Sequence, residues 1–405
     1  MIHYSKDKSL NLKSENPFFS IVIPTKNRSF LVGYAIESIL IQLFNHFEII
    51  IVDNDDTDAT KKVVAAFNDS RIHYYKTGNL SMPENWEYGC SKSVGDYLII
   101  LQDKMVLKPH SLKTLFKIIK LKKPLVIKWQ HDFFNEEIGV GNPSFFPEFK
   151  AQFFDSDLII QSFLDCNLDF FIKHSPIGID SCINMKIIKM IQKGPMKRLC
   201  VPSSPDYTMS FQILNAVDNV FCIPDTLTTM GGIKYSRGVS FFKKENVEEL
   251  LKKDFKVREF DIYSKAPMKV CTTYNTLIND YINVANVVGD RLKKYQLNKF
   301  NYFLYIYDEI QRAKNENVDV AEEMKRWNEA LLLQDDTFIK SIRIAIDQMK
   351  TKECQRTSLW RIRYLIQMVP KIGLYNVMKG VFKSIQWKLR KEKKFDNILE
   401  YVKTW

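Results

Sequence analysis

The chain has 405 residues, enough for two or three domains at roughly 150 residues each. Its 45% hydrophobic and 26% charged residues exclude a disordered or collagen-like protein. The formal net charge is +12, but residues 351–405 alone hold 13 Lys and Arg against four Asp and Glu, which is +9 of the excess. This distribution predicts a basic docking surface for phosphate, acidic lipid or an acidic partner at the C-terminal end, not a body built around nucleic acid.

The seven cysteines are scattered singly, and no CxxC pair occurs. This pattern argues against a structural metal site or a disulfide framework and favours a reducing cytoplasm. Residues 1–17 are polar and lack the apolar core of a signal peptide, and nowhere do about 18 apolar residues run uninterrupted. We therefore expect a cytoplasmic protein, with any membrane contact made peripherally at the inner face of the cell membrane.

Short apolar runs alternate with helix-period stretches from residue 18 onward. Strands are predicted at 19–24, 47–52, 72–75, 97–101 and 125–129, and helices at 30–43, 59–67, 83–93 and 109–119. Strands that are apolar on both faces need helices on both sides, as in parallel sheets. The predicted fold class is therefore α/β, a doubly wound, mostly parallel sheet whose ligands bind beyond the carboxyl ends of the strands.

The character of the chain changes twice after this alternation. Residues 130–240 contain more Pro and Gly and interrupted helical signals, and we interpret them as the second half of the same domain. Beyond Lys243, Gly and Pro become rare and apolar positions recur three and four residues apart, which predicts a helical C-terminal region. The predicted organisation is an N-terminal extension at 1–17, an α/β domain at 18–243 and a helical region at 244–405.

Three polar clusters lie where such a sheet would hold a ligand. Asp53 directly follows the second strand. Asp103 and Lys104 follow the fourth, and Asp206 enters a helix behind a proline turn. A carboxylate at a strand end can accept from a base or a ribose, and a lysine there can neutralise phosphate. Taken singly, these clusters are also compatible with a solvated acidic turn or a helix start.

The order and spacing of the motifs indicate more than each motif alone. The segments are Ser20–Arg28, Glu48–Asn54 with Thr57–Thr60, Leu80–Glu87, Gly95–Asp103 with Pro109 and Leu112, and Ser204–Tyr207 with Met230–Gly232 and Ser236–Gly238. Over about residues 18–240 they resemble glycosyltransferase family 2, the inverting transferases of the GT-A fold. The last segments are similar to a subgroup that makes bacterial surface polysaccharides. The resemblance divides the α/β domain into a nucleotide-binding half at 18–112 and an acceptor half at 113–243.

The resemblance implies a role for each matching residue. Asp206 would be the catalytic base, which removes the proton from an acceptor hydroxyl as that hydroxyl attacks the anomeric carbon. Asp53 would accept from the N3–H of a uracil or thymine ring. Asp103 falls at the first acid of the family's metal and sugar-nucleotide motif. The remaining substrate-binding candidates are Pro24, Thr25, Asn27, Arg28, Asn54, Asn85, Lys104 and Arg237.

At Lys104 the chain departs from the family's run of successive acids, in which the second or third acid binds Mg²⁺ or Mn²⁺. A protonated lysine cannot ligate a cation and would repel it. Either Lys104 supplies the positive charge itself, giving a metal-independent transferase, or catalysis has been lost and a binding fold is left. The presence of Asp53, Asp103 and Asp206 favours the first explanation, and the divalent cation is an open question at this point.

The basic excess near the C-terminus has its own pattern. Residues 372–394 place apolar side chains three and four residues apart, with Lys and Arg between and after them and Trp387 beside Lys388. Such a helix can lie on an anionic membrane surface, where each basic residue contributes about 1 kcal/mol. It can equally be a bundle helix with a solvated charged edge. We expect no nucleic-acid partner, because no stacking platform or helix-turn-helix spacing accompanies the charge.

The resemblance therefore implies an inverting glycosyltransferase that uses a UDP- or dTDP-type nucleotide-sugar donor. Its acceptor would be a glycan or a lipid-linked molecule in bacterial surface polysaccharide synthesis. The alternative is a non-catalytic GT-A-like subunit that binds a nucleotide sugar or scaffolds a partner enzyme. A nicotinamide oxidoreductase fits poorly, because no GxGxxG motif follows the first strand.

Overall fold

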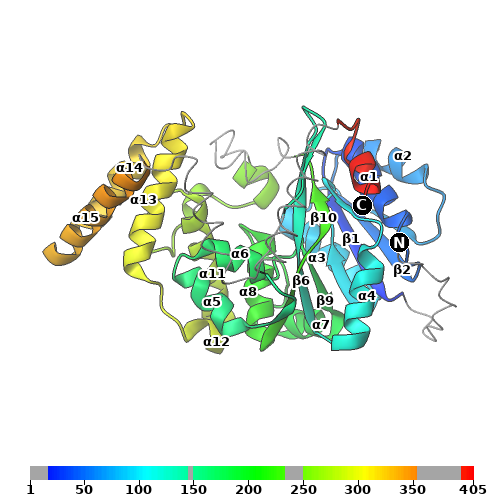
Figure 1. The fold of residues 1–405 in the computed structure, drawn as a ribbon, viewed down its shortest axis with the longest axis horizontal. Coiled ribbons are helices and arrows are strands. Elements are labelled where there is room, and N and C mark those ends of the chain that lie inside the picture. The colour runs from blue at the N-terminus through cyan, green and yellow to red at the C-terminus, as the bar shows by residue number, and fades with distance from the viewer. Residues whose placement is uncertain (1–16, 145–148, 233–249, 354–393) are drawn as a thin grey trace, which may run out of the picture.

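The computed structural model describes residues 17–144, 149–232, 250–353 and 394–405. Within these ranges a mixed sheet of ten strands runs through the body (Figure 1), in the order β3-β2-β1-β4-β9-β6-β10-β5, with β7 beside β6 and β8 beside β10. The strands are β1 (Phe19–Thr25), β2 (Phe47–Asp53), β3 (Ile72–Lys76), β4 (Tyr97–Ile100), β5 (Met105–Leu107), β6 (Val126–Asn135), β7 (Val140–Asn142), β8 (Gln152–Asp155), β9 (Ser181–Asn184) and β10 (Asn219–Met230).

Most strands of the main order run in one direction. Parallel pairing joins β3, β2, β1 and β4, and it also joins β6 to β10. Because β9 lies antiparallel between β4 and β6, the strands β6 and β10 run the same way as β1, whereas β9 and β5 are reversed. The expected doubly wound, mostly parallel sheet is therefore confirmed. The carboxyl ends of β1, β2 and β4 share one edge, which is the edge where ligands bind in such sheets.

Helices cover both faces of the sheet, because its central strands are apolar on both. Side chains alternate along each strand, so that Ile21 and Ile49 pack with α1, α2 and α4, whereas Val22 and Ile50 pack in the cluster that contains α3, α5, α6, α7 and α8. These helices are α1 (Ser29–Leu40), α2 (Ala59–Ala65), α3 (Met82–Lys92), α4 (Ser111–Lys122), α5 (Ser156–Leu164), α6 (Leu168–His174), α7 (Met185–Lys193) and α8 (Pro205–Ala216).

The described part of the C-terminal region is helical, as expected. Its elements are the π-helix η2 (Leu250–Phe255), the 3₁₀-helix η3 (Glu259–Ile262), α11 (Thr273–Val288), α12 (Asp290–Lys293), α13 (Lys299–Asn315), α14 (Ala321–Leu332), α15 (Asp336–Glu353) and α18 (Ile398–Lys403). Within the described ranges we find no helix with the length and apolarity needed to span a bilayer. The predicted basic helix at 372–394 lies, except for Lys394, outside the described residues.

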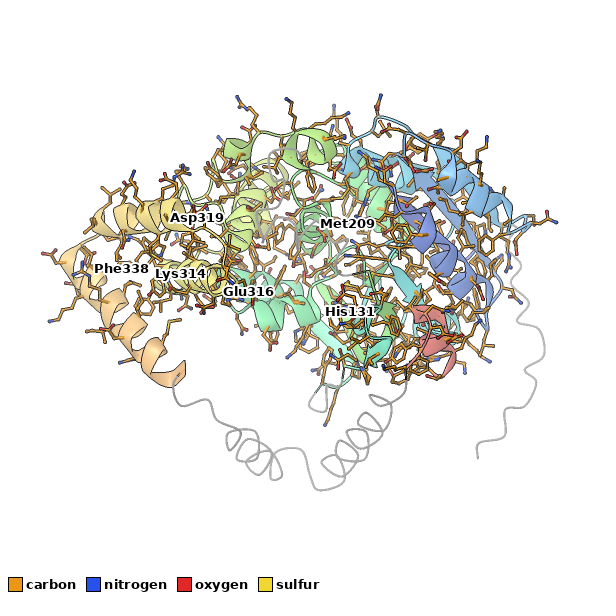
Figure 2. All side chains as sticks on the ribbon, turned by 90° about the horizontal axis from the view of Figure 1, so that it is seen from above. His131, Met209, Lys314, Glu316, Asp319 and Phe338 are labelled. Atoms are coloured by element: carbon orange, nitrogen blue, oxygen red, sulfur yellow. The ribbon has the colours of Figure 1, made fainter. Side chains whose placement is uncertain are left out.

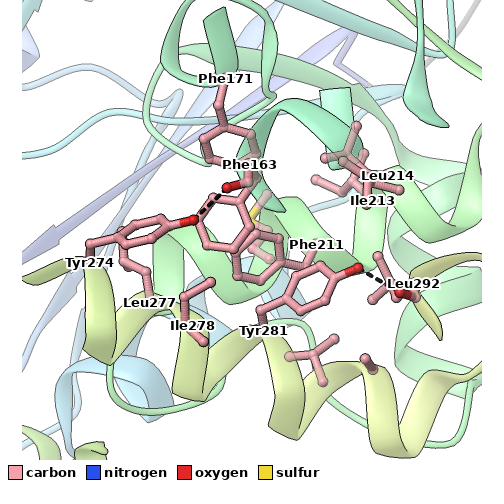
Figure 3. Packing of buried hydrophobic residues seen from close by; sticks show 14 of the residues in the cluster. Phe163, Phe171, Phe211, Ile213, Leu214, Tyr274, Leu277, Ile278, Tyr281 and Leu292 are labelled. Atoms are coloured by element: carbon pink, nitrogen blue, oxygen red, sulfur yellow. Dashed lines mark hydrogen bonds between the residues drawn. The ribbon is translucent and has the colours of Figure 1, made fainter. Parts of the chain in front are cut away.

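The first long C-terminal helix, α11, packs inside the body against α5 and α8 (Figure 3). The Phe211 ring of α8 lies 5.0 Å from the Phe163 ring of α5 and 5.1 Å from the Tyr281 ring of α11, measured between centroids. The Tyr281 hydroxyl donates to the carbonyl of Leu292 at 2.6 Å, so its one polar group is satisfied in the core. α11 therefore shares one hydrophobic core with the α/β domain.

The remaining C-terminal helices lie in two places. α13, α14 and α15 project from the body as an arm (Figures 1 and 2), in which the Phe338 ring packs edge-on against the Phe303 ring at a centroid distance of 5.3 Å. α18 instead returns to the sheet beside α1 (Figure 1). There Tyr401 is fully buried and stacks with Phe134 of β6, and the Phe395 amide donates to the Gly139 carbonyl at 2.8 Å.

Candidate active site

A cavity of about 340 Å³ opens at the carboxyl ends of the parallel strands. Its walls come mainly from four parts of the chain: the loops after β1, β2 and β4, the first half of α3, the start of α8, and the C-terminal region from η2 to α11. The lining residues are Pro24, Thr25, Lys26, Arg28, Asn54, Met82, Asn85, Trp86, Gln102, Asp103, Lys104, Ile179, Ser203, Ser204, Pro205, Asp206, Tyr207, Met230, Leu251, Asp254, Phe255, Ile262, Thr273, Thr276 and Leu277.

The structure brings most of the predicted site residues together in this cavity. The predicted residues that line it are Pro24, Thr25, Arg28, Asn54, Asn85, Asp103, Lys104 and Asp206. Asp53 and Asn27 are not among the lining residues, and Arg237 lies outside the described residues. Asn27 is exposed and takes a left-handed backbone conformation, with φ of 55°, where the chain turns from β1 into α1.

Asp103 is held by two groups of the β1–α1 segment. The Arg28 guanidinium contacts its Oδ1 at 3.0 Å, and the Thr25 hydroxyl donates to its Oδ2 at 2.9 Å. Both carboxylate oxygens of this buried side chain thus already accept from protein donors. The contacts tie the loop after β4 to the loop after β1 across the floor of the cavity.

These residues offer few oxygen ligands for Mg²⁺ or Mn²⁺. The carboxylate of Asp103, at the position of the family's metal motif, is shared with Arg28 and followed by Lys104. No group of three or more His, Cys, Asp or Glu side chains is placed to hold a metal ion in the ranges that the structure describes. The polar floor is instead rich in cationic and amide groups.

Lys104 is the second cation of the floor, and only 9% of it is exposed. The pKa of its ammonium is lowered to about 8, mainly by burial and also by the nearby Arg28, whereas Asp103, Asp206 and Glu136 act in the opposite direction. The side chain is therefore still mostly protonated at pH 7. An anion that entered the cavity would meet two positive groups with little competing water.

Asp206 lies in the first turn of α8, behind Pro205 at the helix start. Burial raises the pKa of its carboxyl group, and a hydrogen bond from the Tyr207 amide at 3.0 Å partly offsets that rise. A carboxylate that is desolvated in this way is more basic than one in water, which suits it to accept a proton.

Asp53 ends β2 behind the cavity wall and is fully buried. Its carboxylate accepts from the Tyr74 hydroxyl at 2.8 Å and from the Asp55 amide at 2.9 Å. Burial raises its pKa, and these two hydrogen bonds lower it. Asn85 of α3 contacts the end of β2, since its side-chain amide donates to the Val52 carbonyl at 2.9 Å.

Several lining residues were not predicted from the sequence, because they come from the C-terminal region. Lys26 forms an ion pair with Asp254 of η2 at 3.2 Å, across 228 residues of sequence. Leu251 and Phe255 of the same short helix add apolar surface. Asp280 of α11 does not line the cavity but contacts the lining residues Ser203 and Ser204, and the signal that could have revealed it is a single charged residue in an otherwise uncharged helix. Burial raises its pKa to about 6.

Part of the chain is similar to known glycosyltransferases. The model of the family described as Glycosyl transferase family 2 matches residues 20–172. A Campylobacter jejuni protein named GalNAc(5)-diNAcBac-PP-undecaprenol beta-1,3-glucosyltransferase is 34% identical over 105 residues, which is 25% of this chain and 34% of the relative. Glycosyltransferase GlyG of Streptococcus pneumoniae is 27% identical over 125 residues, which is 30% of this chain and 41% of the relative.

The matched segment is thus a minor part of these relatives, between 34% and 41% of their length. Among solved structures, S. aureus TarS 1-349 in complex with UDP-GlcNAc superposes with a TM-score of 0.48 at 14% identity, covering 81% of this chain and 92% of that one. The sequence match coincides with the strands and loops that form the polar floor of the cavity. Residues 20–172 are therefore similar to glycosyltransferase family 2 over the part of the chain that supplies most of the predicted site residues.

Proposed function

We propose that the protein is an inverting glycosyltransferase that moves a sugar from a nucleotide-sugar donor to a hydroxyl of a glycan or lipid-linked acceptor. The observation that carries the proposal is the composition of one cavity: a half-buried carboxylate, Asp206, and two cations, Arg28 and Lys104, line it together. A single displacement at an anomeric carbon requires such a pair of functions, a base for the attacking hydroxyl and positive charge for the leaving diphosphate.

In the proposed step, Asp206 accepts the proton of the acceptor hydroxyl while the hydroxyl oxygen attacks the anomeric carbon. The bond between that carbon and the diphosphate oxygen breaks on the opposite side, and the electron pair leaves with the nucleotide diphosphate. Lys104 and Arg28 stabilise the charge that develops there. One displacement inverts the configuration of the sugar.

We propose that these two cations take the place of a divalent metal ion. The support is the donor set described above, in which Arg28 already occupies one oxygen of Asp103. A diphosphate next to Lys104 would raise the pKa of this ammonium from about 8, because an adjacent anion favours the charged form.

The proposed donor carries uracil or thymine. Both rings present the same N3–H donor, from which a carboxylate can accept a hydrogen bond. Asp53 is the proposed acceptor. It lies one residue before the cavity-lining Asn54, and it would reach the base when the Tyr74 hydroxyl releases it.

The proposed acceptor belongs to bacterial surface glycan synthesis. The support is the name of the Campylobacter jejuni relative, which specifies a glycan on a polyprenol diphosphate. The basic residues at 372–394 would bring the enzyme to an anionic membrane that holds such an acceptor. Co-sedimentation of the full chain and of the Lys388→Glu/Lys391→Glu variant with phosphatidylglycerol vesicles tests this part, and equal binding of the two would contradict it.

The central test is the release of UDP or dTDP from a panel of nucleotide sugars with extracts of bacterial glycolipids as acceptors. We expect release that falls about 10²- to 10⁴-fold in Asp206→Asn, the range for loss of a general base. Nucleotide binding, measured by thermal shift, should persist in that variant. Binding without any release in the wild type would favour the non-catalytic, nucleotide-sugar-binding subunit.

A further inference from the structure

The segment that enters α8 is held by a carboxylate from the C-terminal region. The backbone amide of Ser204 donates to Asp280 Oδ2 at 2.9 Å. The amide of Ser203 lies 3.2 Å from both Asp280 oxygens, and the Ser203 hydroxyl lies 3.3 Å from Oδ2. A single side chain of α11 thus accepts hydrogen bonds from two consecutive backbone amides, which lie 77 (Ser203) and 76 (Ser204) residues away in sequence.

The contacts with Asp280 fall just before the start of α8. The Ser204 side chain makes no capping bond to the first amides of this helix. The entry to the helix is instead fixed from α11, because Asp280 accepts from the backbone amides of Ser203 and Ser204. Its charge is stabilised by the backbone and hydroxyl donors of Ser203 and Ser204, which oppose the effect of its burial.

Asp280 is placed rigidly because of the packing around it. It is 1% exposed and lies on α11, whose Leu277 and Tyr281 pack into the aromatic cluster with Phe211 of α8 (Figure 3). Leu277 of the same helix also lines the cavity. The carboxylate is therefore a fixed point between the hydrophobic core and the cavity wall.

The segment that Asp280 holds leads directly to Asp206, the proposed catalytic base. Ser203, Ser204 and Asp206 all line the cavity, and Asp206 follows Ser204 by two residues. On its other side the segment is fixed by Thr208, whose hydroxyl donates to the Val201 carbonyl at 3.0 Å. If the Asp280 contacts are lost, the segment keeps the anchor at Thr208 but can shift at Ser203 and Ser204.

We propose that Asp280 is a positioning residue, which holds the 203–206 segment so that Asp206 meets the acceptor hydroxyl. The inference rests on the proposed function. It assigns part of the active site to the helical C-terminal region, which the match to the family does not cover. A misplacement of about 1 Å at a reacting group can lower the rate about 10²-fold, whereas the donor would still bind to the floor formed by the first strands.

The test compares Asp280→Asn and Asp280→Ala with a matched control, Glu309→Gln. Asparagine keeps the shape and one acceptor oxygen but turns N–H donors toward the loop amides. Glu309 is also a buried carboxylate, which accepts from a backbone amide, that of Tyr274 at 3.0 Å, but it does not contact the 203–206 segment. We expect kcat to fall about tenfold in Asp280→Asn and about 100-fold in Asp280→Ala, with the KM for the donor within twofold of wild type.

Amide hydrogen exchange of residues 201–208 is measured on the same proteins. We expect faster exchange at Ser203 and Ser204 in Asp280→Asn, and wild-type exchange there and near wild-type kcat in Glu309→Gln. A kcat of Asp280→Asn equal to that of Glu309→Gln would overturn the inference. If the wild type releases no nucleotide, the proposed function fails by itself. Unchanged exchange in Asp280→Asn would then overturn the inference separately, and faster exchange would support the holding of the loop.

Discussion

Removal of the charge at position 104 is the sharpest test of how the leaving group is stabilised. Lys104→Met keeps the length of the side chain and removes its ammonium. A unit charge about 4 Å from a phosphate oxygen contributes about 4 kcal/mol at an effective dielectric constant near 20. Loss of one preorganised donor in a water-poor site typically costs about 10²- to 10³-fold in rate. We therefore expect kcat/KM to fall about 10²- to 10³-fold in this variant.

The same lysine predicts a pH dependence. Its pKa in the free protein is about 8, so the ammonium is present below that pH and is lost as the pH rises through it. We expect kcat/KM of the wild type to decline above pH 8, and the decline to move to higher pH in Lys104→Arg, because a guanidinium stays protonated.

The assay is continuous detection of released nucleotide between pH 6 and pH 10, with and without EDTA. Lys76→Met is the matched control, since it removes a cation at the same edge of the sheet but outside the lining of the cavity. Its kcat/KM should stay within twofold of wild type. Undiminished activity of Lys104→Met, or loss of wild-type activity in EDTA, would refute the reasoning.

Three further predictions concern an ion pair at the cavity, a buried carboxylate of α13 and the packing of α18. Lys26→Ala breaks the partly exposed ion pair with Asp254. Because such pairs contribute about 0.2–1 kcal/mol, we expect the KM for the donor to rise by up to roughly fivefold, with little change in Tm. A loss of Tm without an effect on KM would contradict this prediction. Burial raises the pKa of Glu309 to about 7, above its ordinary value of 4.5, so the folded state binds more protons between these values. Wild-type stability in urea should therefore fall between pH 5 and pH 7.5 relative to Glu309→Gln, and parallel profiles would count against the shift. Tyr401→Ala removes a fully buried aromatic residue and should lower the free energy of unfolding by about 3–5 kcal/mol. Gly141→Ala should also destabilise the protein, because the added Cβ would meet the Tyr401 ring. Urea midpoints equal to wild type would show that this packing is unimportant.

The sequence predicted the first half of the fold closely. The predicted strands at 19–24 and 47–52 are β1 and β2, and the predicted helix at 83–93 is α3, shifted by one residue at each end. Such strands are apolar on both faces and are bounded by polar loops, so their pattern depends little on distant contacts. β10 was not predicted, because Pro224 and Asp225 interrupt its apolar pattern; its register to β6 shifts between Cys222 and Thr226.

The site was predictable to the extent that strand order determined it. Thr25, Asp103 and Lys104 converge because parallel neighbours end at the same edge of the sheet. Asp254 reaches the cavity, and Asp280 reaches the lining residues Ser203 and Ser204, only through the packing of η2 and α11, and no local pattern encodes those contacts.

The shared core of α11 and α8 bears on how chains with this architecture can diversify. A fragment that ended at residue 243 would leave Phe163 of α5 and Phe211 of α8 facing water, and we expect it to aggregate instead of folding alone. The helical region therefore cannot be exchanged between relatives as a detachable module. Substitutions along the cavity-lining side of α11, such as at Thr276, offer another path, since they would reshape one wall of the site while the floor made by the first strands stays intact.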